Sequence, residues 1–330
     1  PMGRWNWERT TAVLLLAPSV IAVAIFFYAF IAFTGYSSLT NWKTLVPDFT
    51  FVGFKNYQSL FAHPRFQIGM RNTFTFMILF LGGCLSVGFF LALLLDQGIR
   101  GEGFFRGVYL FPMAVSFIVT GVAWRWMLNP GTAEWGATGV NLLFEKLGLG
   151  FLKWGWFTDP TVIHIRPESG LGQFLHSMGL GFFASPIFGM SVGIISLVLA
   201  ATWQMSGYTM AMYLAALRAI PDELREAARV DGATEWQITR YVIWPLVRPV
   251  TLAASIILGH ISLKIYDLVV AMTGPGPGFA TDVPAYFMWE TTFEGNRFNR
   301  GAAIAVVLLV LVAFLIVPYL ARSTTTEAEL

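Results

Sequence analysis

The sequence predicts an all-α membrane protein, built as a bundle of six transmembrane helices. Of its 330 residues, 56% are hydrophobic and only 12% are charged, whereas an ordinary soluble domain is about 45–50% apolar and about 25% charged. The mean hydropathy is correspondingly high, at +0.63. The chain also contains apolar runs that reach the length of about 20 residues needed to cross the hydrocarbon of a bilayer.

These runs are separated by segments that hold nearly all of the charged residues. Strands of a membrane barrel would instead appear as alternating segments of about ten residues. Since only helices and closed barrels satisfy their backbone hydrogen bonds in lipid, the runs indicate a single transmembrane domain over residues 1–330. The predicted spans cover about 12–34, 73–95, 107–128, 187–213, 250–272 and 302–321.

The first run is expected to be a retained span, although Arg4 and Arg9 precede it as in a secretory signal. It is longer than the roughly 7–15 apolar residues of a signal peptide, and no clear cleavage site follows it. The arginines of the segment 215–248 favour a cytoplasmic position for that loop. Both termini are then expected in the cytoplasm.

The composition and motifs exclude several kinds of site. The net charge of +2 gives no indication of a nucleic-acid partner. Cys84 is the single cysteine, so no intrachain disulfide is possible, and the four histidines lack the spacing of metal ligands. No enzyme motif is found, so no catalytic residue is predicted. The phosphate-binding Gly-x-x-x-x-Gly-Lys-Ser/Thr loop of ATPases is also absent.

The loop at 215–248, between the fourth and fifth predicted spans, carries the clearest local signals. Pro221 suits the first position of a helix, and Asp222 and Glu223 complement the helix dipole in its first turn. Gly232 follows where such a helix is expected to end.

A second helix is predicted directly after this glycine. Thr234 and Gln237 have the spacing of a capping box, which marks a helix start. Pro245 and Pro249 are expected to end this helix and to lead into the fifth span, because proline lacks the backbone donor that a helix interior needs.

The first loop helix has a face of small side chains formed by Leu224, Ala227 and Ala228 at helical spacing. Alanine would let another surface approach closely. From the residues alone two interpretations stay open, a helix that docks into a cytoplasmic partner and a solvated helix at the membrane interface.

The same loop resembles the EAA loop of binding-protein-dependent ABC transporter permeases, in the sugar (maltose-type) branch. The resemblance continues at 53–57, 104–106, 110–112 and 156–160, whereas about 164–184 looks like an insertion. The residues that carry the motif are Glu226, Ala227, Ala228, Asp231, Gly232 and Ala233, followed by Ile243, Pro245 and Pro249.

The resemblance implies a permease subunit that couples to a separate ATPase through the EAA helix. The residues expected to make this coupling are Glu226, Ala227, Ala228, Asp231, Gly232 and Ala233. Expected partners are a second permease subunit, often a different chain, a dimer of ATP-binding subunits that holds ATP and magnesium, and an extracytoplasmic sugar-binding protein. The chain itself needs no cofactor, and its location would be the cytoplasmic membrane of a bacterium or an archaeon.

The fifth span contains His260, Lys264 and Asp267, whose ionisable side chains are costly at membrane depth. Lys264 and Asp267 are three residues apart, so they would share a helix face and could pair. The alternatives are a structural ion pair, a contact with the solute and a role in gating. Trp203, Gln204 and Tyr208 of the fourth span offer similar chemistry, and Gln204 and His260 also suit interhelical hydrogen bonds.

The stretches 111–121, 266–273 and 282–285 are similar to glucose/mannose-type permeases within the sugar branch. This similarity implies a monosaccharide, with a disaccharide or glycerol phosphate as the alternative. A transporter driven by an ion gradient is the alternative from another class, because Lys264 and Asp267 could relay protons.

Overall fold

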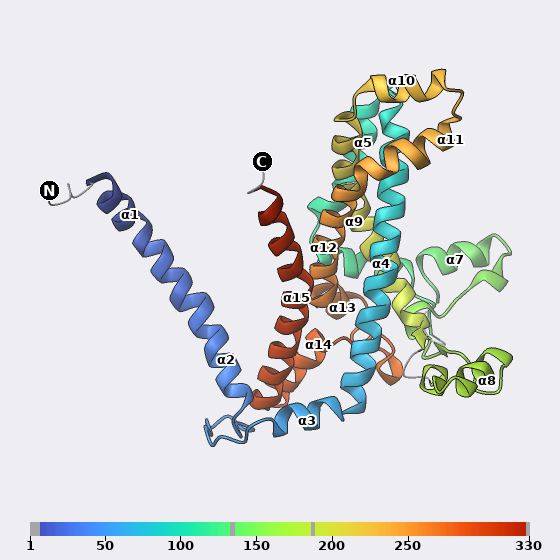
Figure 1. The fold of residues 1–330 in the computed structure, drawn as a ribbon. Helices are drawn as coiled ribbons and strands as arrows, with labels where there is room; N and C mark the ends of the chain where they lie inside the picture. The colour runs from blue at the N-terminus through green and yellow to red at the C-terminus, as the bar shows by residue number, and fades with distance from the viewer. Residues whose placement is uncertain (1–6, 133–135, 186–188, 328–330) are drawn as a thin grey trace. The chain divides into compact units, whose positions relative to one another are not determined.

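The computed structural model describes residues 7–132, 136–185 and 189–327. The chain groups into two compact units. Unit 1 consists of Pro1–Ala62 and Met288–Leu309, and unit 2 consists of His63–Phe287 and Val310–Leu330. Figure 1 shows the helices in chain order. The expectation of a single membrane domain stays a prediction.

Unit 1 contains a helical rod that precedes a loop and a short helix. The stretch Thr11–Ser38 of this rod is long and apolar enough to cross a membrane, and its most apolar 18-residue window holds no buried residue. Ser37 and Ser38, at the end of the stretch, are buried. The elements of unit 1 are α1 (Trp7–Val23), the π-helix η1 (Ala24–Ala29), α2 (Phe30–Ser38), α3 (Lys55–Phe61), the π-helix η8 (Glu290–Glu294) and the first part of α15 (Phe298–Glu327).

Unit 2 is a helical bundle with a two-stranded antiparallel ribbon in which Val162 pairs with Ser191. Its elements are α4 (Pro64–Asp96), α5 (Glu102–Ala114), α6 (Phe117–Met127), α7 (Gly139–Lys146), η2 (Gly150–Leu152), η3 (Trp156–Thr158), β1 (Val162–Ile163), α8 (Gly170–Ser177), η4 (Gly181–Ala184), β2 (Met190–Ser191), α9 (Val192–Arg218), α10 (Asp222–Val230), α11 (Glu235–Ile238), the π-helix η6 (Thr239–Ile243), α12 (Trp244–Leu263), α13 (Asp267–Met272), η7 (Pro277–Phe279) and α14 (Pro284–Trp289).

Four of the predicted spans have counterparts that are long and apolar enough to cross a membrane. The stretches are Thr11–Ser38, Pro64–Asp96, Glu235–Leu263 and Phe298–Pro318. The helices α5 and α6 make a fifth candidate only when they are taken together as one bent pair. The total of six single spans therefore stays a prediction, although the bundle is compatible with it.

The stretch predicted as the span 107–128 is not a single straight helix, because α5 and α6 are bent by 100° at the break between them. Val115 has extended backbone angles there, and the Ser116 side chain accepts a hydrogen bond from the Val119 backbone and so begins α6. The freed Val115 carbonyl accepts a hydrogen bond of 2.6 Å from the Gln204 amide of α9. This bond satisfies a backbone group that the break would otherwise leave unpaired.

The span predicted over 250–272 is also broken. Helix α12 ends at Leu263, and α13 begins only at Asp267. In contrast, Pro245 and Pro249 do not end a helix, since the stretch from Glu235 to Leu263 is helical throughout. The π-helical turn η6 precedes Pro245, and irregular turns of this kind let membrane helices accommodate proline.

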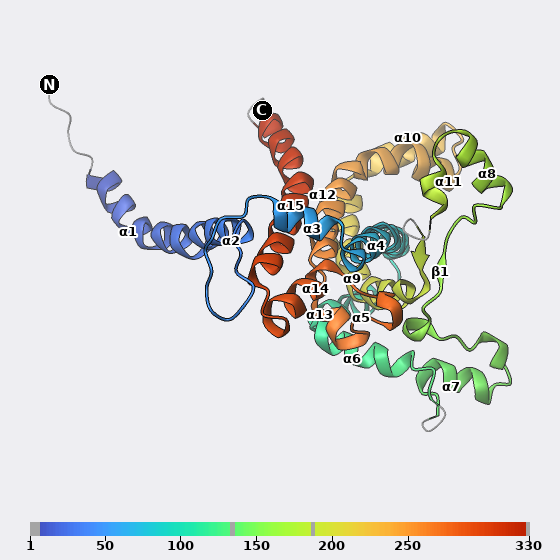
Figure 2. The same ribbon diagram turned by 90° about the horizontal axis from the view of Figure 1, so that it is seen from below.

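Helix α9, the counterpart of the predicted span 187–213, lies at the centre of unit 2. Residues 187 and 188 of that prediction are outside the described residues. Of the 27 residues in α9, 16 are buried, and Figure 2 shows α4, α5 and α12 around it. Because protein rather than lipid surrounds it, α9 can carry more polar residues than the four apolar stretches do.

Two glycines allow close approach of helices to α9. A Cβ on Gly88 of α4 would lie 2.8 Å from the Met210 backbone nitrogen, and a Cβ on Gly207 would overlap the Tyr109 carbonyl oxygen of α5. Small residues at such crossings let the helix backbones approach closely. The resulting van der Waals packing drives helix association in lipid, where no hydrophobic effect acts between helices.

Candidate functional site

Helix α10, the predicted EAA helix, lies across the end of α4, α5 and α9 (Figure 1). It spans Asp222–Val230, and its first turn carries Asp222 and Glu223 as predicted. The sequence suggested Pro221 as the first helical residue, but in the structure Pro221 precedes the helix as its N-cap. At this position the proline still removes no hydrogen bond from the helix.

A tight turn ends α10 at the predicted glycine. Gly232 has a φ of +81°, a conformation that side chains rarely adopt. Hydrogen bonds from Ala233 to the Ala228 carbonyl and from Gly232 to the Arg229 carbonyl close the turn. The capping box predicted for Thr234 and Gln237 is present and starts α11.

A largely buried ion pair fixes α10 to the end of α4. Arg225 lies 2.7 Å from Asp96, and their side chains are 17% and 10% exposed. Arg225 also donates to the Leu217 carbonyl at the end of α9, at 3.0 Å. One arginine thus joins three helices. No local pattern in the sequence pairs Arg225 with Asp96, which is the last residue of the long helix α4.

Two further ion pairs, both more exposed to solvent than the Arg225–Asp96 pair, lie at the same end of the bundle. Arg218 of α9 is 2.7 Å from Glu102 of α5. Arg229 of α10 is 2.8 Å from Glu235 of α11, and hydrogen bonding to Glu235 raises the pKa of Arg229. Exposed pairs of this kind contribute only about 0–1 kcal/mol each, so the Arg225–Asp96 pair is the main electrostatic attachment of α10.

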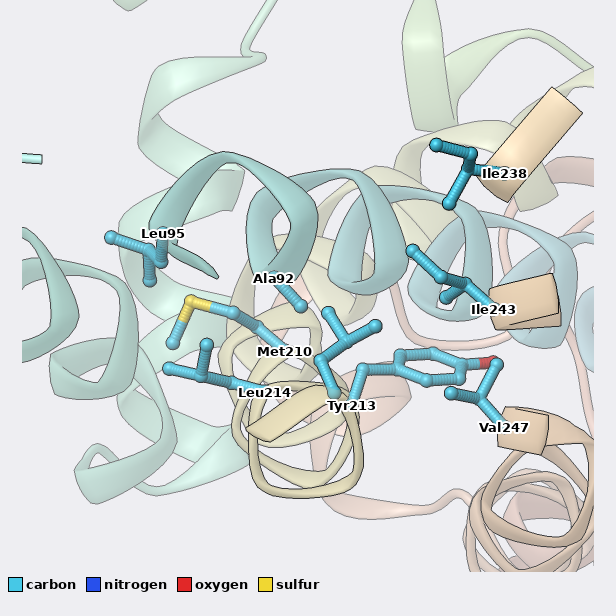
Figure 3. Close-up of a cluster of buried hydrophobic side chains, with 9 residues drawn as sticks. Ala92, Leu95, Met210, Tyr213, Leu214, Ile238, Ile243 and Val247 are labelled. Atoms are coloured by element: carbon cyan, nitrogen blue, oxygen red, sulfur yellow. The ribbon is translucent and has the colours of Figure 1, made fainter. Parts of the chain in front are cut away.

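A cluster of buried apolar side chains lies beneath the loop helices and joins them to the bundle (Figure 3). Ala228 of α10 and Ala233 pack against its edge. The buried members come from α4, α9, α11, η6 and α12, and they are Ala92, Leu95, Met210, Tyr213, Leu214, Leu217, Ile238, Ile243 and Val247. Since packed interiors transmit displacement, movement of α10 would be felt by all of these helices.

The opposite side of α10 is open to solvent. Glu223, Glu226 and Ala227 are exposed there, and Leu224 and Val230 expose 45% and 87% of their surface. Exposed apolar side chains with a polar rim are a feature of interaction surfaces. Ala227 and Ala228 therefore do not share one environment, because Ala228 is partly buried inward and Ala227 faces outward.

The residues predicted to line a substrate path lie in different surroundings. Gln204 is buried and holds the break between α5 and α6. Trp203 is 42% exposed, with its ring 6.0 Å from Trp124, and Tyr208 is half-buried. His260 is also half-buried, and its Nδ1 has no hydrogen-bond partner in the described structure.

Lys264 and Asp267 do not pair in the way that helical spacing suggests. The chain between them is not helical, both side chains are exposed, and no ion pair joins them within the described residues. An exposed charge in a membrane-spanning segment is favourable only towards water or another protein surface. Both residues lie at the break between α12 and α13, just beyond the apolar stretch that ends at Leu263.

No group of histidine, cysteine, aspartate and glutamate suited to a metal ion occurs in the described part of the chain.

A comparison with known protein families shows which family the chain belongs to. Residues 84–325 match the family model described as "Binding-protein-dependent transport system inner membrane component". The chain belongs to this family of ABC transporter permeases.

Relatives of the permease match nearly the whole chain. A probable ABC transporter permease protein of Pyrococcus horikoshii is 38% identical over 93% of this chain and 94% of its own length. The xylose/arabinose import permease protein XacH of Haloferax volcanii is 33% identical over 87% of this chain and 80% of its own length. The relatives are permeases and not enzymes, and the chain is accordingly a multi-pass membrane component of a transporter.

Solved structures confirm the fold. A bacterial ABC transporter involved in the import of alginate has a TM-score of 0.67 to the permease, at 22% sequence identity, and covers 97% of this chain and 99% of its own. The prediction of an importer permease bundle is confirmed, whereas the coupling and path residues stay predictions.

Proposed function

We propose that the permease is a translocating subunit of an ATP-driven sugar importer and that α10 is the surface on which the ATPase acts. The carrying observation is the position of α10, which is exposed on its outer side and tied to α4 and α9 through Arg225. The proposed coupling residues are Glu226, Ala227, Ala228, Asp231, Gly232 and Ala233.

The proposed mechanism follows from this attachment. ATP and magnesium bound by the partner subunits would supply the energy by drawing the two ATPase subunits together. Helix α10 would move with its ATPase, and the apolar cluster beneath it would pass the movement to α4, α9 and α12. The bends at Val115 and at Lys264 offer places where these helices can change their angle without unwinding.

A second permease subunit is proposed to face the exposed side of Trp203, Lys264 and Asp267. Charged and aromatic groups on that face would then line a shared path, with Tyr208 and His260 beside it. A neutral hydroxylated solute needs a few donors and acceptors among aromatic rings, as this set provides. We propose a heterodimer, an extracytoplasmic sugar-binding protein as the donor of solute, and both termini in the cytoplasm.

The proposed solute is a neutral monosaccharide of the glucose/mannose type. Support comes from the xylose/arabinose permease among the relatives and from the resemblance at 266–273. A relative named for trehalose/maltose transport, from Thermococcus litoralis, is 26% identical and keeps a disaccharide as the second candidate. A transporter driven by an ion gradient does not bind an ATPase, so the exposed face of α10 favours the ATP-driven mechanism.

Sugar-stimulated ATP hydrolysis tests this proposal. The complete transporter in liposomes, with its binding protein, is assayed with glucose, mannose, xylose, maltose, trehalose and glycerol phosphate in turn. We expect stimulation by a monosaccharide and none by glycerol phosphate. Stimulation by a disaccharide alone would contradict the monosaccharide assignment. Uptake that survives ATP depletion but collapses with a protonophore would contradict the ATP-driven mechanism itself.

A further inference from the structure

A strongly basic cavity of about 480 Å³ lies in unit 1, where the loop after α2 and the helix α3 meet the start of α15. Its volume is in the range of small-molecule sites. Four cationic side chains line it, those of Lys43, Lys55, Arg297 and Arg300, and none of its described lining residues is acidic. A cavity of this charge selects an anion.

The four cations have no anionic partner among the described residues. None of them makes an ion pair or a side-chain hydrogen bond in the part of the chain that the structure describes. Asp48 is close enough to Lys43 to feel its charge, but hydrogen bonds from Thr50 and Asn41 are the larger reasons for the lowered pKa of Asp48. Clustered cations repel one another, so bringing them together without a carboxylate favours an external anion.

The cavity is held in shape by buried amides. Asn56 donates to the carbonyls of Ser38 and Thr40, both at 2.8 Å. Asn299 donates its side-chain amide to Asn56 at 2.8 Å and its backbone amide to the Trp42 carbonyl at 2.9 Å. Asn56 and Asn299 are 7% and 3% exposed. Such a preformed site binds without a large ordering cost.

An apolar groove begins next to the basic cavity. Trp42 and Phe298 stack at 4.7 Å and line the groove, while their chain neighbours Lys43 and Asn299 line the cavity. The groove has a volume of about 250 Å³, and a second hollow of about 280 Å³ shares Thr34 and Ala305 with it. The two hollows therefore continue along α2 and α15, away from the charges.

We propose that unit 1 binds an anionic phospholipid, with its phosphate in the basic cavity and one acyl chain in the groove between α2 and α15. The cavity lies where two membrane-length helices end, which is the depth of lipid headgroups. A free anion would use the cavity but leaves the groove unexplained. An acidic protein surface would likewise not extend along the apolar stretch.

The test measures lipid that stays with the complete transporter. Transporter purified in detergent is exchanged into phosphatidylglycerol, phosphatidylcholine or a mixture, and bound lipid is quantified by native mass spectrometry. The variants are Arg297→Gln/Arg300→Gln for the headgroup and Ala305→Phe for the groove. The control is Arg166→Gln, an exposed arginine outside the cavity. Thermal unfolding of each variant shows whether the protein is intact.

We expect the wild-type protein to retain phosphatidylglycerol in preference to phosphatidylcholine. Retention should fall roughly tenfold or more in the double arginine variant, as the loss of two basic contacts to lipid predicts, and should also fall in Ala305→Phe but not in the control. Equal retention by all intact variants would overturn the proposal. Displacement of the lipid by millimolar inorganic phosphate would assign the cavity to a free anion. Loss of binding-protein docking with unchanged lipid would assign it to an acidic partner.

Discussion

Asp96→Ala is expected to abolish most sugar-stimulated ATP hydrolysis and uptake by the assembled transporter. Asp96 is the partner of Arg225, and the variant leaves an arginine that is only 17% exposed without its counter-ion. Loss of one partner from a buried pair costs about 3–5 kcal/mol, and the residual exposure of this pair places it at the lower end. A loss of only about 1.4 kcal/mol lowers tenfold the population of transporters in which α10 is held against α4.

The control for this prediction is Glu102→Ala, which removes a second ion pair at the same end of the bundle. The Arg218–Glu102 pair has side chains 45% and 25% exposed, so its loss should change coupling by less than about 1 kcal/mol. A double variant, Asp96→Leu/Arg225→Met, removes both charges and should recover part of the activity that Asp96→Ala loses. Equal effects of Asp96→Ala and Glu102→Ala would contradict the anchoring role.

Gly207→Ala is expected to destabilise the bundle more than other glycine substitutions in the spans. Its Cβ would overlap the Tyr109 carbonyl oxygen, and a backbone atom cannot rotate away. Overpacking of this kind costs about 1–3 kcal/mol, and occasionally more. The apparent melting temperature of the complex in detergent, measured by fluorescence, should fall. The elbow between α5 and α6 should also shift, because Gln204 holds it from the same helix.

Gly82→Ala is the matched control, since it also lies in a membrane helix but a Cβ there meets nothing within 4 Å. Alanine has a helix propensity about 1 kcal/mol better than glycine, so this variant should be as stable as the wild-type protein or slightly more so. Equal melting temperatures of the Gly207→Ala and Gly82→Ala variants would show that α5 and α9 are not in close contact.

Local signals in the sequence predicted the loop helices well. The acidic first turn of α10, the glycine at its end and the capping box at Thr234 all depend on residues within a few positions of one another. The apolar runs likewise predicted the four long membrane helices, because length and hydropathy are properties of a single segment. These features required no knowledge of the tertiary structure.

The breaks and the anchor could not be predicted in this way. The bend at Val115 is stabilised by Gln204, 89 residues later in the chain, and Arg225 meets Asp96 across 129 residues. A single sequence gives no measure of such distances. Pro245 does not end a helix as predicted, because a π-helical turn just before it lets the helix continue. Lys264 and Asp267 do not share a helix face as predicted, because the helix ends at Leu263.

Helix α10 is proposed to contact the ATPase, and a cross-link from its outer face tests this contact directly. Cys84 is the single cysteine and is fully buried, so Ala227→Cys introduces a unique reactive site on the outer face of α10. A photo-cross-linker attached there should join the permease to the ATP-binding subunit. The same reagent at Leu147→Cys, an exposed site after α7, should not. Absence of an ATPase adduct from Ala227→Cys, or an equal adduct from Leu147→Cys, would contradict the coupling mechanism.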